Sequence, residues 1–242
     1  MPIRTPAIVL RTYDFSESSQ VVVLLGRETG KIRGLAKGCR RSSPSAIAKF
    51  SGGFELLTGG EILFKTKPEQ ELSTLVEWNL AEDRHALRQD WRAQNLGFFA
   101  AECADACLPD GDPHPAIHDA LETFLAALPQ AAGRPAALLM FLTTLLRETG
   151  HHPRLHTDAG GNPLPDLPVC AFDPSSGGLV PTAASPDWRV RRETVLALRA
   201  ADLGAPLDEH GAETLHRASR LLTVWLRHLL GAELATMKAV LE

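Results

Sequence analysis

Basic side chains are concentrated in one short stretch, GKIRGLAKGCRRSSPSAIAKF, at residues 30–50. This stretch has no Asp or Glu and contains these cations: Lys31, Arg33, Lys37, Arg40, Arg41 and Lys49. Because like charges repel one another, such a stretch is either a solvated loop or a site that an anion neutralises. Gly30, Gly34 and Gly38 favour an anion site, since glycine lets a backbone turn or approach a ligand closely. The predicted chemistry is noncovalent binding of phosphates, as along a nucleic-acid strand.

The rest of the chain is acidic. The 242 residues carry a net charge of -4 at pH 7. Residues 1–78 contain 11 basic residues (Lys and Arg) and 8 acidic residues (Asp and Glu). Residues 79–242 contain 14 basic and 21 acidic residues. We therefore expect the N-terminal part to meet a polyanion and the acidic part to meet protein.

The elements that position the basic stretch are predicted to be strands. Short segments rich in Val, Ile, Leu and Thr alternate with Gly, Ser or Pro clusters, which is typical of β-structure. These segments are residues 6–13, 20–26, 31–36, 53–66 and 71–78. The TGG at 58–60 is expected to form a turn. This pattern predicts an OB-fold β-barrel over residues 1–79, with the basic stretch near the surface where such barrels commonly hold nucleic acid.

From about residue 79 the hydrophobic period becomes helical. The expected helices cover residues 81–108, 115–128, 134–150, about 185–203 and about 208–242. The fourth is expected to begin at Ser185 and Pro186, and the last to break at Gly231. The fold class is therefore α+β with two domains, an OB-fold barrel followed by a helical bundle over residues 80–242. Residues 151–186, dense in Pro and Gly, are expected to form a long ordered loop or small subdomain inserted in the bundle.

Two aromatic residues near the basic stretch, Tyr13 and Phe15, have two interpretations. Either ring could stack on a base, as aromatic residues do in single-strand sites. A small barrel also needs large side chains in its core, so we expect both to be core residues.

Signatures of an enzyme or a membrane protein are absent from the sequence. The chain has no P-loop, no G-x-G-x-x-G after a strand, no H-E-x-x-H and no G-x-S-x-G. Glu82 and Asp83, beside His85, are expected at the start of a helix, where acidic side chains interact favourably with the helix dipole. With no signal peptide or bilayer-length apolar segment, we expect a cytoplasmic protein that is not an enzyme and has no cofactor and no membrane partner.

Several motifs resemble those of the RecO family of recombination mediators. An S-E-S segment at 16–18 lies between two apolar strands, an E-x-G turn follows at 28–30, and A-K-G-x-R follows at 36–40. Weaker similarity continues with G-H-x-P-x-L at 150–155, GGL at 177–179 and a terminal RHLLGAEL. The resemblance implies an N-terminal OB-fold and a C-terminal helical domain.

The resemblance also implies a non-enzymatic role in DNA repair and homologous recombination. A RecO protein is expected to bind single-stranded and duplex DNA, to anneal complementary strands, and to help load RecA together with RecR and single-strand-binding protein. Lys37 and Arg40 occupy the family's basic motif, so the resemblance implies that they bind DNA. The other candidates are added for their charge and proximity alone: Lys31, Arg33, Arg41 and Lys49.

The resemblance also raises the question of a metal. Many RecO proteins hold zinc with two C-x-x-C pairs in the loop of the helical domain. Here Cys170 is followed by Asp173 and by no later thiol, so the usual site is missing. A substitute built from Cys170 with His151, His152 and His156 is one alternative, but we expect apolar packing of the loop and no metal. Cys103 and Cys107 are expected to be buried small hydrophobes, and Cys39 an incidental thiol beside the basic stretch.

Two other functions stay open. An OB-fold RNA-binding or ribosome-associated factor would share the basic strand and would prefer structured RNA to DNA. A protein-interaction scaffold would keep its partner binding after the basic stretch is neutralised.

Overall fold

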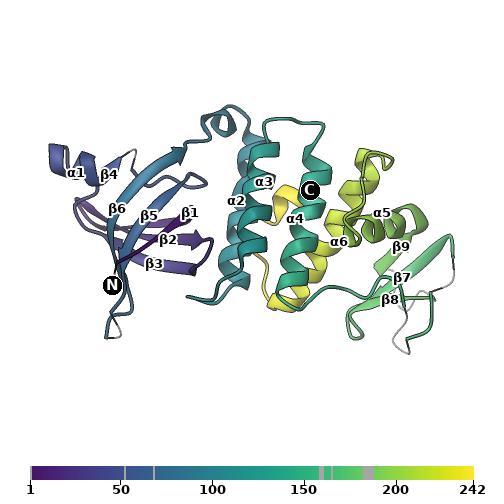
Figure 1. Ribbon diagram of the computed structural model, residues 1–242. Helices are drawn as coiled ribbons and strands as arrows, with labels where there is room; N and C mark the ends of the chain where they lie inside the picture. The colour runs from purple at the N-terminus through teal and green to yellow at the C-terminus, as the bar shows by residue number, and fades with distance from the viewer. Residues whose placement is uncertain (1, 52, 68, 158–160, 165, 182–187) are drawn as a thin grey trace. The chain divides into compact units, whose positions relative to one another are not determined.

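The computed structural model describes residues 2–51, 53–67, 69–157, 161–164, 166–181 and 188–242. It divides into two compact units, residues 1–129 and residues 130–242 (Figure 1). The first unit contains the barrel and the helices that follow it up to residue 129, and the second contains the remaining helices and a small sheet. In the described part of the chain, no helix is both long and apolar enough to cross a membrane. The domain boundary between residues 79 and 80 stays a prediction.

The first unit contains the predicted barrel. Its strands are β1 (Pro2–Ser16), β2 (Ser19–Gly26), β3 (Gly30–Ala36), β5 (Gly59–Lys65) and β6 (Ser73–Glu82). They pair in the order β3-β2-β1-β5-β6, and a parallel pairing of β3 with β6 closes the sheet on itself. The helix α1 (Pro44–Lys49) and the short strand β4 (Phe50–Ser51) lie in the connection between β3 and β5, with β4 parallel to β6. The α+β class and the OB-like barrel are confirmed.

Alternating side chains of the strands fill the barrel. The core holds Val9, Val22, Leu24, Ile62 and Trp78 without solvent exposure. The Phe54 ring lies 5.3 Å from the Trp78 ring, between centroids. Because these aromatic rings occupy the interior, the barrel needs no further large side chain from the end of β1.

The prediction of a turn at TGG, residues 58–60, is wrong. Gly59 and Gly60 begin strand β5, and the turn comes earlier, at Leu56 and Leu57. A Cβ on Gly60 would lie 2.3 Å from the carbonyl oxygen of Asn79 in the neighbouring strand. The glycine is therefore needed for close strand packing rather than for a turn.

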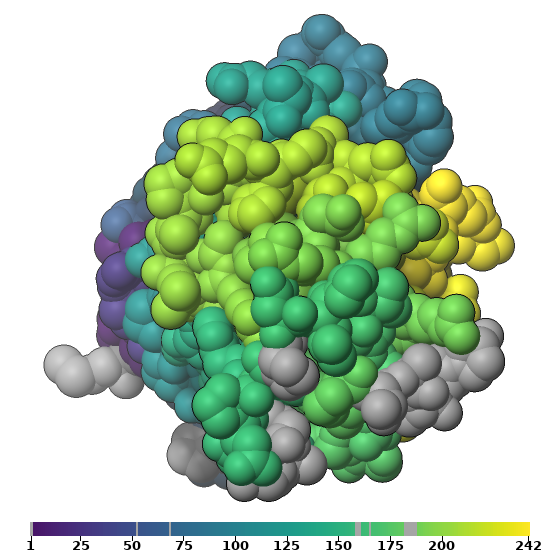
Figure 2. Space-filling view, turned by 90° about the vertical axis from the view of Figure 1, so that its right-hand side faces the viewer, coloured from purple at the N-terminus to yellow at the C-terminus, as the bar shows by residue number. Residues whose placement is uncertain are grey.

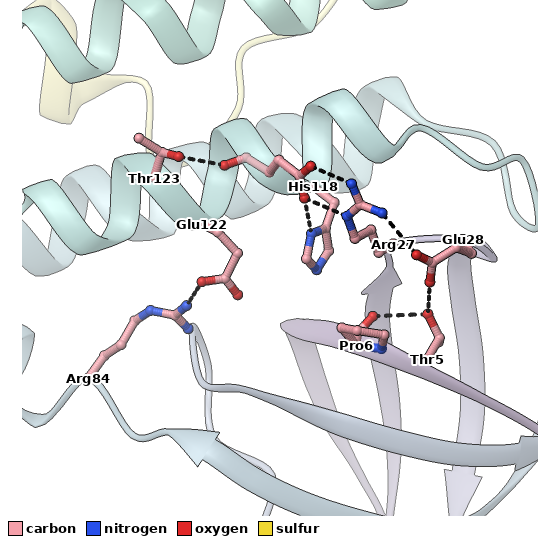
Figure 3. A network of polar contacts seen from close by, with 9 residues as sticks. Thr5, Pro6, Arg27, Glu28, Arg84, His118, Glu122 and Thr123 are labelled. Atoms are coloured by element: carbon pink, nitrogen blue, oxygen red, sulfur yellow. Dashed lines mark hydrogen bonds and ion pairs between the residues drawn. The ribbon is translucent and has the colours of Figure 1, made fainter.

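Two helices of the first unit lie against the barrel: α2 (Trp91–Cys107) and α3 (Pro115–Ala127), with the short 3-10 helix η1 (His85–Gln89) before them. The carboxylate of Asp90 caps α2 by accepting hydrogen bonds from the amides of Arg92 and Ala93. Ion pairs join α3 to the barrel and to the segment that follows strand β6 (Figure 3). Two guanidinium nitrogens of Arg27 each donate to the Asp119 carboxylate at 2.8 Å, and Arg84 binds Glu122.

The second unit is built on the helices α4 (Arg134–Glu148), α5 (Arg192–Asp202), α6 (Ala212–Leu230) and α7 (Lys238–Leu241). Much of the surface drawn in Figure 2 belongs to the segments of α5 and α6. Helix α6 ends at Gly231, which adopts a left-handed conformation with φ of 64°, so the predicted break is confirmed.

The segment 151–186, expected to be a long ordered loop or small subdomain, contains the strands β7 (Val169–Asp173) and β8 (Gly178–Val180). They form a small sheet with β9 (Arg189–Arg191), in the order β8-β7-β9. The Phe172 ring lies 5.3 Å from the Trp225 ring of α6, so the sheet packs on the helices. The expected helix start at Ser185 and Pro186 lies outside the described residues. The described helix begins at Arg192, because residues 189–191 pair with β7 as a strand.

Candidate nucleic-acid interface

The structure divides the six predicted cations among three places. Lys31 and Arg33 lie on strand β3, beside acidic residues at the end of α2. Lys37, Arg40 and Arg41 lie at the turn that follows β3, and Lys49 lies in the last turn of α1. These cations therefore have different surroundings although they are close in sequence.

Lys31 is buried. Its side chain is 5% exposed, and its Nζ donates a hydrogen bond of 2.7 Å to the carbonyl oxygen of Asp105. The carboxylates of Asp105 and Asp110 lie 3.3 Å and 3.5 Å from the same ammonium. A phosphate could reach Lys31 only if these contacts opened, so we leave it out of the candidate surface.

Arg33 is half exposed, and its Nε lies 3.0 Å from the carboxylate of Asp110. An exposed ion pair of this kind contributes little to stability and can exchange its partner. Arg33 nevertheless points to the acidic end of α2, where a polyanion would meet like charge.

Two of the three glycines in the basic stretch serve packing. A Cβ on Gly30 would lie 2.1 Å from the carbonyl oxygen of Asp112, and one on Gly34 would lie 2.3 Å from the Leu75 side chain. Only Gly38 lies in the turn that carries exposed cations, with φ of 71°. The expected close approach of a ligand is therefore wrong for Gly30 and Gly34, whereas the alternative, a turn with positive φ, is found at Gly30, whose φ is 69°.

The turn after β3 is fixed to the hairpin between β1 and β2. The Gly38 amide donates to Ser19 Oγ at 3.1 Å, and the Arg40 amide donates to the Ser18 carbonyl oxygen at 3.1 Å. The S-E-S and A-K-G-x-R segments, about twenty residues apart in the chain, thus lie in direct contact. Nothing in the sequence of either segment indicates that the two would touch.

The cations of this turn differ in their partners. Arg40 forms an ion pair of 2.5 Å with Asp14 on the neighbouring hairpin, and both side chains are well exposed. Lys37, Arg41 and Lys49 are exposed and form no ion pair with any described residue. These three cations are available to a solvent anion, and Arg40 becomes available by exchanging one surface partner.

Tyr13 and Phe15 are exposed, at 48% and 62%, so the expectation that they belong to the core is wrong. Strand β1 pairs with β5 only from Pro2 to Ile8, and its later residues pair with β2 alone. The end of β1 therefore extends past the closed part of the barrel. Its rings remain at the surface, and Arg11 fixes one of them by donating to the Tyr13 hydroxyl at 3.1 Å.

These residues surround the end of the β1–β2 hairpin, and we name them together the tip surface: Tyr13, Phe15, Lys37, Arg40 and Arg41. The register places it on three adjacent strands, since Asp14 pairs with Gln20 and Gln20 pairs with Ala36. Neighbouring strands lie about 5 Å apart, and side chains alternate along a strand, so Tyr13 faces away from Asp14 and its partner Arg40. A bound strand would therefore pass around the end of the hairpin to meet both. Two carboxylates, of Asp14 and Glu17, belong to the same hairpin.

The thiol beside the tip surface is not activated. Burial raises the pKa of the Cys39 thiol above its usual value, despite the nearby Arg40. Burial also raises the pKa of Cys107 to about 11 and that of Cys103 well above its usual value. None of these three thiols is therefore poised to react at neutral pH.

The candidate metal ligands of the second unit have other partners. Asp173 closes the turn between β7 and β8, since its Oδ1 accepts from the Ser175 amide at 3.0 Å and its Oδ2 from the Ser176 amide at 3.2 Å. His152 and His156 both face the Asp202 carboxylate, at 3.3 Å and 3.1 Å. Among the residues that the structure describes, no group of three or more His, Cys, Asp or Glu side chains could hold a metal ion.

Comparisons with known proteins cover nearly the whole chain. The family model "Recombination protein O N terminal" matches residues 1–84, and "Recombination protein O C terminal" matches residues 88–238. A "DNA repair protein RecO" of Anaeromyxobacter dehalogenans (strain 2CP-C) is 33% identical over 247 residues, which are 98% of this chain and 94% of the relative. Proteins of the same name from Geobacter sulfurreducens and Salinibacter ruber are 31% and 30% identical, over 89% and 85% of this chain and 80% and 77% of their own lengths.

Proposed function

Because this chain belongs to the RecO family and has a role in DNA repair, we propose that it binds single-stranded and duplex DNA through the tip surface. One observation carries the proposal: the exposed cations after β3 are held beside two exposed aromatic rings on the β1–β2 hairpin. Of the six candidates, Lys37, Arg40 and Arg41 are the central phosphate contacts, and Lys49 on α1 is an additional one.

Cationic and aromatic side chains bind different parts of a DNA strand. Lys and Arg neutralise phosphates and release counterions, which gives affinity without reading the sequence. Tyr13 and Phe15 stack on bases, which favours unpaired strands because only these offer their base faces. Duplex DNA would then bind through phosphate contacts alone and more weakly.

The same surface would support annealing of complementary strands. A cationic patch screens the repulsion between two strands, and a modest number of contacts lets them exchange quickly. No covalent bond changes in this process, so the proposal names no catalytic residue. We further propose, from the family, that the protein acts with RecR and single-strand-binding protein in loading RecA.

Salt dependence tests the proposal. The Lys37→Ala, Arg41→Ala double variant is expected to lower the magnitude of the log-log salt slope for a dT oligonucleotide by about 1.4, since each single-strand phosphate contact contributes about 0.7. The control is Lys65→Ala with Lys67→Ala, which removes two exposed charges near the opposite end of β1, where Lys65 pairs with Pro2. An equal decrease in both double variants would show that net charge, rather than the tip surface, binds DNA.

The native protein and the tip variant, Lys37→Ala with Arg41→Ala, also test the two alternative functions. Preference for structured RNA over DNA in competition would support an RNA-binding factor. If the tip variant kept full function in cells, the scaffold hypothesis would be favoured instead.

A further inference from the structure

A cavity of about 280 Å³ lies beside the tip surface within the first unit. Thr12 and Gln20 line it from β1 and β2, and Arg40 lines it from the turn after β3. Arg88 of η1 and Gln94 and Phe98 of α2 line it from the helical side. The cavity therefore brings barrel residues and helix residues to one site, which we name the groove.

Arg40 belongs to both the tip surface and the groove. Its guanidinium is partly exposed and is held by one surface ion pair, with Asp14. A strand whose phosphates follow the tip surface would thus meet the groove at Arg40.

The charges of the groove suit one phosphate. Its lining includes the guanidinium groups of Arg40, Arg84 and Arg88. Each is paired with a carboxylate: Arg40 with Asp14, Arg84 with Glu122 and Arg88 with Glu55. Arg40 and Arg88 are about half exposed, so either can exchange its surface carboxylate for a phosphate, which suits a single phosphate rather than a long polyanion.

The helical side of the groove suits a base. Gln94 and Phe98 are four residues apart, so they share one face of α2 and present an amide and a ring together. Trp91 lies three residues before Gln94 on the same face and is 68% exposed. The Arg92 guanidinium carbon lies 5.5 Å from the Trp91 ring centroid. Rings with a neighbouring amide provide stacking and hydrogen bonding to a base edge.

We infer that the groove receives one unpaired nucleotide of a DNA strand, with Arg88 and Arg40 at its phosphate and Phe98 and Gln94 at its base. This inference rests on the proposed function and adds a second contact region, on the helices, to the one on the barrel. The cavity is near the lower end of the volumes of small-ligand pockets, about 300 Å³, so it has no room for a paired base. The groove would therefore strengthen the preference for single strands.

The test compares two probes of equal length, a dT oligonucleotide and an abasic oligonucleotide. The variant Glu55→Gln with Arg88→Gln keeps the net charge of the chain, and it is expected to lower the salt slope for both probes by about 0.7. Gln94→Ala is expected to weaken binding of dT several-fold and binding of the abasic probe very little. Lys67→Gln with Glu69→Gln is the matched control, because it also keeps the net charge and changes two exposed residues that do not line the groove. Thermal unfolding confirms that each variant is folded.

The outcomes separate the groove from the tip surface. If the tip variant lowers the salt slope while the Glu55, Arg88 and Gln94 variants behave like the Lys67, Glu69 control, the groove does not bind a nucleotide and the proposed function stands. If the native protein binds neither probe, both proposals are wrong. A hexa-aspartate peptide tests for a protein site instead. If the peptide binds the native protein and binds the Arg88 variant more weakly, while that variant binds DNA as the native protein does, the groove is a protein site.

Discussion

The ammonium of Lys31 donates a hydrogen bond of 2.7 Å to the carbonyl oxygen of Asp105, and this contact ties strand β3 to the last turn of α2. The most N-terminal cation of the basic stretch thus stabilises the attachment of a helix to the barrel. Arg33, two residues further along β3, is half exposed and pairs with Asp110. The two residues allow structural and DNA-binding roles to be separated experimentally.

Lys31→Met is expected to destabilise the protein by about 1 to 3 kcal/mol, because it leaves the carbonyl oxygen of Asp105 without its donor. The Asp105 and Asp110 carboxylates keep Arg11 and Arg33 as partners. Arg33→Met is expected to cost less than about 1 kcal/mol, since its ion pair is exposed. Denaturant unfolding followed by circular dichroism measures both. The salt slope for single-stranded DNA should not change in Lys31→Met. A lower slope with unchanged stability would instead make Lys31 a phosphate ligand.

The pair of Arg27 and Asp119 predicts a dependence of stability on pH. Hydrogen bonds from Arg27 lower the pKa of Asp119 from 3.8 to about 2. The folded pKa is thus below the unfolded one, so the pair stabilises the fold above about pH 4, and this contribution is lost as the pH falls towards 2. Because the Asp119 side chain is 50% exposed, solvent screening limits the contribution to at most about 1 kcal/mol.

The measurement is the free energy of unfolding of the native protein and of Asp119→Asn from pH 7 to the acid limit of folding. The difference between them should be constant near neutral pH and should shrink below about pH 4. Glu69→Gln, which removes an exposed carboxylate elsewhere in the first unit, is the control. A difference that does not vary with pH would mean that Asp119→Asn destabilises the protein through altered packing rather than through loss of charge.

Gly38 sets the conformation of the turn that carries the cations of the tip surface. Its φ of 71° is unfavourable for a β-branched residue and acceptable for Asn. Gly38→Val is therefore expected to displace Lys37 and Arg41 and to lower the salt slope by up to about 1.4, although no charge is removed. Gly38→Asn should keep the native slope. Equal slopes in the two variants would show that the turn need not be held in this conformation for DNA binding.

The sequence predicted the fold class because strand and helix periods change near residue 79 and because each segment has its own turn signals. It also predicted the helix break at Gly231, which a local left-handed conformation requires. It did not predict the burial of Lys31, since Asp105 and Asp110 are more than seventy residues away and only the packing of α2 brings them near. A charge count by segment treats all six cations alike, whereas burial separates them.

The exposure of Tyr13 and Phe15 was unpredictable for a related reason. Local pattern shows that β1 is a strand but does not show how far each neighbour pairs with it. The ladder with β5 stops at Ile8, so the last residues of β1 lack a second partner. Whether an aromatic residue becomes core or surface thus depends on the relative lengths of strands that are far apart in sequence.

Tyr13→Ala and Phe15→Ala are expected to weaken binding of a dT oligonucleotide by about 1 to 3 kcal/mol for each base that loses its stacking partner. The salt slope should stay at its native value, because neither variant removes a phosphate contact. Stability should change by no more than about 0.5 kcal/mol, since both rings are exposed. Ile3→Ala, at the opposite end of β1, is the control for loss of an exposed apolar side chain. If either aromatic variant unfolds at much lower denaturant and binds DNA as the native protein does, its ring stabilises the hairpin and does not contact a base.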